Sequence, residues 1–261
     1  MDNSKSTQPI GLFDSGIGGT SIWREIHALL PNEDTIYLAD SKNAPYGPRS
    51  KDEIIALSFK NTDYLLEQGA KIIVVACNTA TTNAIKEMRA KYDVPFIGIE
   101  PAIKPAATNT KTNTVGILAT KGTLSSELFH KTVADFKDTK VIEQVGYNLV
   151  QLIEDGKTES EEVFSLLQQY LQPMVDENID YLVLGCSHYP YLLPQIKRIL
   201  PPHVKIIDSG EAVARQTKSV LEKNGLLNTT PHQSSQAFYT NLDTAVLQSF
   251  VPGFPVSKKD F

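Results

Sequence analysis

The chain has 261 residues, of which 41% are hydrophobic and 21% charged, and its formal net charge is −5. This composition is ordinary for a globular protein, and the length suffices for one large domain or two small ones. The negative charge, without any basic run, argues against binding to nucleic acids and to anionic membranes, which depends on concentrated lysine and arginine.

The N-terminal residues 1–8 are polar, so they lack the apolar core of a signal peptide. No apolar run approaches the roughly 18 residues of a membrane span. We therefore expect a cytoplasmic protein, in which the two cysteines, Cys77 and Cys186, are free thiols. Two isolated cysteines and five scattered histidines do not have the spacing of a structural zinc site, so no metal is expected.

The first part of the chain predicts a β-α-β-α-β order. Short apolar runs bounded by polar turns are typical of strands buried on both faces of a parallel sheet. The strands are expected at residues 10–13, 35–39 and 72–76, and the helices at residues 21–30 and 50–68. The glycine-rich turn 14–19, between the first strand and the first helix, presents backbone N–H groups that favour an anion.

The second part of the chain repeats this pattern, after a polar run at 109–113 that predicts a domain boundary. Segment 116–122 is a looser copy of segment 11–16, and similar offsets lead from each segment to a cysteine that ends a strand. Further helices are expected at residues 80–91 and 163–174 and from Cys186 to Leu200, and further strands at residues 96–99, 114–118, 181–185 and 204–207. The tail from residue 253 is expected to form an ordered strap or a frayed end.

Both cysteines follow strands, at the sheet edge where ligands of open parallel sheets bind. A single buried cysteine is more often a small hydrophobic residue. Cys77 and Cys186, one in each of two related halves, instead indicate a pseudo-symmetric site between the halves. Two bases on opposite faces of one carbon perform racemisation or epimerisation. Near-attack contacts of ~3.5 Å on each face place the two sulphurs about 7 Å apart, too far for a disulfide.

A free thiol has a pKa of ~8.5, so catalysis requires neighbours that stabilise the thiolate or carry protons. His188 is one candidate, and its alternative role is to cap the following helix. Asp14 is another, and its alternative role is a helix N-cap. Asp208 and Ser209 are expected mainly to cap a helix. The glycines of turn 14–19 invite comparison with a dinucleotide-binding loop but lack the G-x-G-x-x-G spacing.

Four sequence blocks combine these features: Phe13–Gly19 (FDSGIGG), Ala44–Gly47 (APYG), Ala76–Ala80 (ACNTA) and Leu184–Pro190 (LGCSHYP). Together they closely resemble the signatures of bacterial glutamate racemase, in the aspartate/glutamate racemase family, and the resemblance covers nearly the whole chain. It implies cofactor-independent interconversion of L- and D-glutamate, which supplies D-glutamate for peptidoglycan. The acid/base thiols would be those of Cys77 and Cys186.

The resemblance also implies roles for other residues. Asp14, His188 and Glu154 would assist the thiols, although Glu154 has an alternative as a solvated charge at a helix end. The substrate would be bound by Asp14, Ser15, Pro45, Tyr46, Gly47, Asn78, Thr79, Thr120, Ser187 and His188. Ser187 stands where the family commonly has threonine, so the hydroxyl is kept and a methyl group is lost.

The implied fold class is α/β, with two similar doubly wound parallel-sheet domains that face each other across the active site. The first domain would comprise residues 8–103 plus 209–261, with Cys77, and the second residues 104–208, with Cys186. The family resemblance further implies a homodimer.

Three alternatives remain at this point. A racemase of the same family that acts on aspartate or another acidic amino acid would differ in pocket depth. A nucleotide-binding oxidoreductase would use the glycine-rich turn but leave the paired cysteines unexplained. A non-catalytic protein of the same fold would not need Cys77, Cys186, Asp14 and His188 together.

Overall fold

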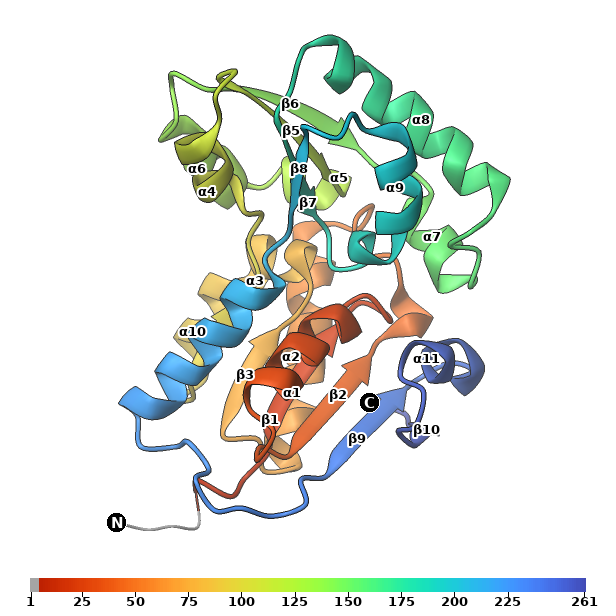
Figure 1. Ribbon diagram of the computed structural model, residues 1–261. Coiled ribbons are helices and arrows are strands. Elements are labelled where there is room, and N and C mark those ends of the chain that lie inside the picture. The colour runs from red at the N-terminus through yellow and green to blue at the C-terminus, as the bar shows by residue number, and fades with distance from the viewer. Residues whose placement is uncertain (1–4) are drawn as a thin grey trace.

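A computed structural model describes residues 5–261, so the polar stretch 1–8 lies partly outside the described residues. The molecule has two lobes, each built on its own sheet, and the chain returns at its C-terminal end to the lobe that contains its first strand (Figure 1). We call the lobe with the first strand the first lobe. Within residues 5–261, no helix is both long enough and apolar enough to cross a membrane.

The sheet of the first lobe has six parallel strands in the order β10-β9-β2-β1-β3-β4. Their bounds are β1 Ile10–Asp14, β2 Thr35–Ala39, β3 Ile72–Val75, β4 Phe96–Gly98, β9 Gln236–Thr240 and β10 Val256–Lys258. In β3, Ile72 and Val74 join the core on one face of the sheet, and Ile73 and Val75 join the core on the other. Burial on both faces is the reason that this strand reads as a continuous apolar run.

Helices cover both faces of this sheet. Helix α1, Thr20–Leu29, packs with α10, Gly210–Lys223, on one face, and α2, Lys51–Glu67, packs with α3, Asn78–Lys91, on the other. The remaining elements of this lobe are the 3₁₀ turn η1 Ser41–Asn43 and α11 Thr244–Phe250. Ser50 begins α2 with a reciprocal pair of hydrogen bonds to Glu53, a capping box that satisfies free N–H groups.

The second sheet has four parallel strands in the order β6-β5-β7-β8, which repeats the β2-β1-β3-β4 order of the first. Its strands are β5 Thr114–Ala119, β6 Lys140–Val145, β7 Tyr181–Gly185 and β8 Lys205–Ile207. The helices of this lobe are α4 Ile103–Asn109, α5 Lys121–Leu124, α6 Glu127–Ala134, α7 Leu149–Glu154, α8 Glu161–Asp176, η2 Tyr189–Leu192 and α9 Leu193–Ile199. The predicted α/β class with parallel sheets is confirmed.

The single helix expected between Cys186 and Leu200 is wrong. The chain forms a 3₁₀ turn, η2, and then a separate helix, α9. Pro190 and Pro194 each lack a backbone N–H, so a continuous helix would lose hydrogen bonds there. The tail is an ordered strap, because β10 pairs with β9 and the side chain of Phe261 is buried.

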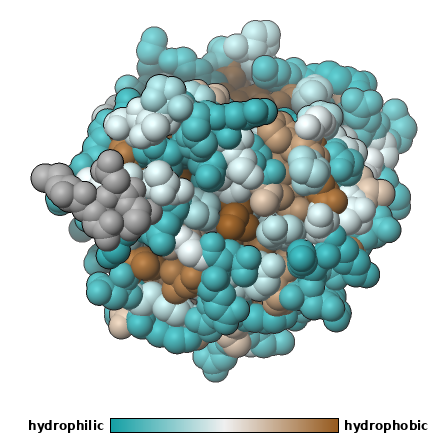
Figure 2. All heavy atoms as spheres, turned by 90° about the horizontal axis from the view of Figure 1, so that it is seen from below, coloured by the Kyte–Doolittle hydropathy of each residue, from teal (hydrophilic) through white to brown (hydrophobic). Residues whose placement is uncertain are grey.

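The carboxyl ends of β1, β3, β5 and β7 point toward the space between the lobes (Figure 1). Seen from below, the molecule presents a face that is hydrophilic around its edge, with hydrophobic residues gathered near its centre (Figure 2). The site lies elsewhere. Because the carboxyl ends of these strands face the space between the lobes, the polar and reactive side chains that follow the strands meet there and not on the lower face.

Candidate active site

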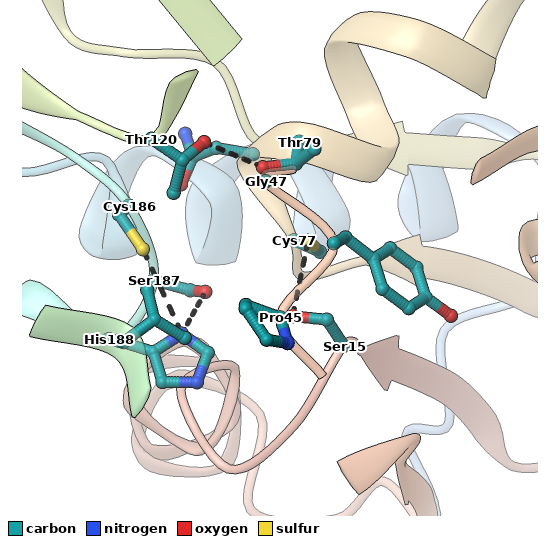
Figure 3. Close-up of a pocket in the computed structure, with 12 residues that line it drawn as sticks. Ser15, Pro45, Gly47, Cys77, Thr79, Thr120, Cys186, Ser187 and His188 are labelled. Atoms are coloured by element: carbon teal, nitrogen blue, oxygen red, sulfur yellow. Dashed lines mark hydrogen bonds between the residues drawn. The ribbon is translucent and has the colours of Figure 1, made fainter. Parts of the chain in front are cut away.

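A pocket between the lobes brings together most of the residues predicted from the sequence. It is lined by Ser15, Pro45, Tyr46, Gly47, Cys77, Asn78, Thr79, Thr120, Val150, Cys186, Ser187 and His188. The sulphurs of Cys77 and Cys186 enter it from different lobes (Figure 3). Asp14 and Glu154 do not line the pocket but contact residues that do. Val150 was not predicted, because nothing distinguishes it from a core residue of α7.

Cys77 is the N-cap residue of α3. Its Sγ accepts a hydrogen bond from the N–H of Ala80 at 3.5 Å and lies 3.8 Å from the hydroxyl of Ser15. A helix N-terminus stabilises a thiolate. Burial has the larger effect, and with the charge of Asp14 it raises the pKa of Cys77 well above its ordinary value. Cys77 is therefore a protonated thiol at neutral pH.

Cys186 has a different partner. Its Sγ lies 3.8 Å from Nδ1 of His188 (Figure 3). The other ring nitrogen of His188, Nε2, lies 2.6 Å from Oε1 of Glu154. A carboxylate only accepts hydrogen bonds, so Nε2 of His188 must carry a proton and donate a hydrogen bond to Glu154. The N–H of Gly18 lies 3.3 Å from the same nitrogen but does not donate to it, because a protonated Nε2 has no free lone pair. Burial alone lowers the pKa of His188, but its contacts with Cys186 and Glu154 and the charge of Asp14 raise that pKa well above its ordinary value. His188 is no side-chain cap of η2.

Glu154 lies against the glycine-rich turn, and its side chain is only 9% exposed. Its Oε1 accepts the N–H of Ile17 at 2.7 Å, and its Oε2 accepts the hydroxyl of Ser41 at 3.2 Å. The alternative role as a solvated helix-end charge is therefore wrong. Glu154 instead connects His188 of the second lobe to two segments of the first.

Asp14 lies close both to Cys77 and to His188, the neighbour of Cys186, and its side chain is fully buried. Its carboxylate accepts the N–H groups of Ser15 at 2.8 Å and Gly19 at 2.6 Å and the hydroxyl of Ser187 at 3.2 Å, and it lies 3.9 Å from Nδ1 of His188. Burial raises the pKa of Asp14, although His188 and the N–H of Gly19 act in the opposite direction. Asp14 thus both satisfies the start of α1 and contacts the site. Asp208, by comparison, accepts the N–H of Gly210 at the start of α10.

The glycine-rich turn is covered by the second lobe. A Cβ at Gly16 would lie 1.9 Å from Oε1 of Glu154, and a Cβ at Gly18 would lie 2.2 Å from Nδ1 of His188. Real Cβ atoms essentially never approach so closely, so a side chain at either position would displace Glu154 or His188 from the turn. Because these two side chains occupy the surface of the turn, no dinucleotide phosphate fits there, and this argues against the oxidoreductase alternative.

The loop that carries Pro45 and Tyr46 is held by residues that the sequence reasoning did not select. The hydroxyl of Tyr46 donates to the buried carboxylate of Asp40, which also accepts the side-chain amide of Asn241. Asn61 donates to the Tyr46 hydroxyl at 3.1 Å. The position of Asp40 at the carboxyl end of β2 was an available signal, whereas nothing in the sequence marks Asn241.

The two lobes also touch on the α3 side of the pocket. The hydroxyls of Thr79 and Thr120 lie 2.8 Å apart, and the amide of Asn83 donates to the carbonyl of Gly122 at 2.9 Å. The cavity between the lobes has a volume of about 10 Å³. This is roughly the space that one water molecule requires, so an amino acid enters only when these walls move.

Besides the two thiols and the imidazole of His188, the polar side chains of the pocket are hydroxyls and the amide of Asn78, which suit carboxylates. The lining includes no lysine or arginine. Oδ1 of Asn78 is buried and has no hydrogen-bond partner within the described part of the chain. Between residues 5 and 261, no group of three or more His, Cys, Asp or Glu side chains is arranged to hold a metal ion. Both cysteines are free, as predicted.

Comparison with known proteins agrees with this site. The Asp/Glu/Hydantoin racemase family matches residues 10–217. The glutamate racemase of Herpetosiphon aurantiacus is 46% identical over 239 residues, which cover 91% of this chain and 94% of that protein. A solved glutamate racemase isoform of Bacillus anthracis has a TM-score of 0.87 and 30% identity over 98% of both chains. The glutamate racemase of Francisella tularensis subsp. tularensis, solved with D-glutamate, has a TM-score of 0.84 and 31% identity over 97% of both chains.

The chain therefore belongs to the Asp/Glu/Hydantoin racemase family, and it is an enzyme, an amino-acid racemase. The relatives that match it over nearly its whole length are glutamate racemases, in agreement with the four sequence blocks.

Proposed function

We propose that this enzyme interconverts L- and D-glutamate without a cofactor and so supplies D-glutamate for peptidoglycan synthesis. The observation that carries the proposal is the entry of two free thiols, Cys77 and Cys186, into one small pocket from different lobes (Figure 3). Two acid/base groups on opposite faces of one carbon are what inversion by proton transfer requires.

In the proposed reaction, the thiolate of one cysteine takes the α-proton, so the C–H bond breaks and an S–H bond forms. The electron pair left on Cα is delocalised into the neighbouring carboxylate. The opposed thiol then donates its proton to the other face of Cα, which inverts the centre. The enzyme ends with its thiol and thiolate exchanged. With substrate bound, the separation of about 7 Å between the sulphurs stays a prediction.

His188 and Asp14 support this chemistry from two sides. His188, held protonated by its partners, would stabilise the thiolate of Cys186, which lies 3.8 Å away. Glu154 would act as a positioning residue that orients the imidazole and keeps its charge. Asp14 would relay a proton for Cys77 and bind the substrate ammonium.

The remaining polar groups of the pocket would bind the substrate. Carboxylates match the hydroxyls of Ser15, Thr79, Thr120 and Ser187, together with N–H groups of the main chain near Tyr46 and Gly47. The unpartnered Oδ1 of Asn78 matches the ammonium group. Pro45 and Tyr46 would give the pocket its shape, as a wall held by Asp40.

The broader organisation belongs to the same proposal. The two domains would comprise residues 8–103 plus 209–261 and residues 104–208, a division that agrees with the strands of each sheet. The enzyme would be a cytoplasmic homodimer without nucleic-acid or membrane partners. Light scattering of the purified protein at several concentrations tests the dimer, and a monomer mass throughout would refute it.

The first experiment follows L-glutamate and D-glutamate separately by circular dichroism in deuterated water, with NMR of the α-position. Loss of optical signal from both enantiomers, with deuterium entering Cα and no cofactor added, is the expected result. Aspartate run in parallel tests the alternative substrate, and faster turnover of aspartate would overturn the glutamate assignment. Restoration of activity by metal after exhaustive EDTA dialysis would overturn the cofactor-independent mechanism.

A further inference from the structure

A second and larger cavity adjoins the catalytic pocket, on the side where α3 faces α5 and α6. Its volume is about 980 Å³, and Gly47 lines both cavities. We call this second cavity the basic groove. Its cationic side chains are Arg49, Lys51, Lys86, Arg89, Lys121 and Lys131, against three glutamates. A groove of this charge is notable on a chain whose net charge is −5, because it concentrates positive potential at one place.

Three of these cations are free to attract a solute. Lys51 is paired with Glu87 at 3.3 Å, whereas Lys86, Lys121 and Lys131 have no hydrogen bond or ion pair within residues 5–261. All three are exposed. They come from both lobes, Lys86 from α3 and the other two from α5 and α6. Their ammonium groups therefore face solvent on both sides of the groove.

The catalytic pocket itself has no lysine or arginine. The positive charge of His188 is balanced by the carboxylates of Glu154 and Asp14 beside it, so the pocket exerts little net attraction on an acidic substrate. Only a thin wall separates it from the groove. A Cβ at Gly122 would lie 2.8 Å from Cγ2 of Thr79 and 3.0 Å from the carbonyl oxygen of Gly47. The wall is closed by the hydrogen bond between Thr79 and Thr120, 2.8 Å long, which joins the lobes.

We propose that the basic groove is the entry vestibule for the acidic substrate. Its free lysines capture the dicarboxylate from solution, and the substrate then passes Gly47 into the catalytic pocket when the Thr79–Thr120 contact parts. The inference rests on the proposed function, since it takes an acidic amino acid as the substrate. It adds a binding step outside the catalytic pocket and assigns it to Lys86, Lys121 and Lys131.

The test compares the triple variant K86Q/K121Q/K131Q with a matched control, K218Q/K223Q/K258Q, which removes the same charge from α10 and β10 outside the groove. Three cations about 10 Å from a singly charged anion predict a fall in kcat/KM of about five-fold at low salt, with kcat unchanged. The difference from wild type shrinks below about two-fold at 0.5 M salt, where the screening length is a few ångströms. The control variant keeps the wild-type kcat/KM.

A second measurement does not depend on turnover. Glutarate is a dicarboxylate that lacks the α-amino group, and an NMR titration with it is expected to shift the amide signals of residues 121–131 in wild type but not in the triple variant. Equal kcat/KM values for the two triple variants at low salt would overturn the proposal, as would identical glutarate shifts. If the wild type does not racemise glutamate but its glutarate shifts still differ from those of the triple variant, the proposed function is refuted and the binding site in the groove is not. If the triple variant does not fold, the single variants K121Q and K131Q give the same two readouts.

Discussion

The imidazole of His188 lies directly against the main chain of Gly18, so that a Cβ at Gly18 would lie 2.2 Å from Nδ1. The two residues are 170 positions apart and belong to different lobes. Because no side chain fits between them, the glycine-rich turn sets the position of the imidazole and hence of the group next to Cys186.

Replacement of Gly18 by alanine tests this relationship. The added methyl group must push the imidazole away by about 1 Å, and a shift of that size costs about 100-fold in rate. We expect kcat for racemisation to fall by roughly this factor, while the unfolding midpoint changes little. Gly210→Ala, at the start of α10, is the matched control, since its Cβ would meet only flexible side-chain atoms no nearer than 3.1 Å. A Gly18→Ala enzyme with wild-type kcat would refute the positioning role.

The variants Cys77→Ser and Cys186→Ser test the role of each thiol by itself. A serine hydroxyl is a far weaker acid than a thiol, so it does not supply the base, and racemisation should fall by at least about 1,000-fold in each variant. Each variant should retain slow deuterium exchange at Cα for one enantiomer only, and the two variants should retain opposite enantiomers. NMR of each enantiomer in deuterated water measures this. Near-normal racemisation by either variant contradicts the two-thiol mechanism.

Glu154→Gln removes a charge that raises the pKa of His188. The imidazolium is then lost at lower pH, so the alkaline limb of the kcat profile should move to lower pH. At a pH above the pKa of His188 in both enzymes, the rate should fall by roughly ten-fold for each unit by which that pKa drops. Asp155→Asn is the control. The carboxylate of Asp155 neighbours Glu154 in the sequence, but it is 40% exposed and pairs with Lys157 rather than with His188. An unchanged alkaline limb in Glu154→Gln would show that Glu154 does not set the charge of His188.

The pKa of Cys77 offers a direct test of the electrostatics. Burial and the charge of Asp14 raise that pKa, so thiolate should form only at alkaline pH. In a Cys186→Ser background, the ultraviolet absorbance of thiolate reports Cys77 alone. Asp14→Asn removes a negative charge, so the titration should move to lower pH, whereas Asp63→Asn, at the exposed end of an ion pair with Lys91, should leave it in place. A shift to higher pH in Asp14→Asn would contradict this account.

A buried ion pair provides a stability prediction remote from the pocket. Nζ of Lys71 lies 2.5 Å from Oε2 of Glu33, both side chains are 1% exposed, and Oε1 of Glu33 accepts the N–H of Asn228 at 2.8 Å. Glu33→Ala leaves a buried ammonium unpaired, so the free energy of unfolding should fall by about 3–5 kcal/mol. Urea unfolding measures this, and kcat per folded enzyme should not change. Glu211→Ala, which removes the exposed partner of Arg215, should change stability little.

Much of the fold follows from local sequence. The strands β1, β2, β3, β5 and β7 lie close to their predicted positions because strands buried on both faces are continuous apolar runs. The edge strand β6, Lys140–Val145, was not predicted, because its residues are only partly buried and its polar residues interrupt the apolar run. Where a run faces solvent on one side, its sequence resembles a loop.

The sequence by itself determined the two thiols, the strands that deliver them and the resemblance to glutamate racemases, because burial periodicity and short motifs are local properties. Only the tertiary structure decided which groups meet these motifs. Glu154 contacts Ile17 across 137 positions and His188 covers Gly18 across 170, and both contacts exist because two separately built lobes close on one another. Local sequence patterns do not predict such contacts between surfaces. The neighbours that set the pKa values of Cys77 and His188 could therefore be identified only from the tertiary structure.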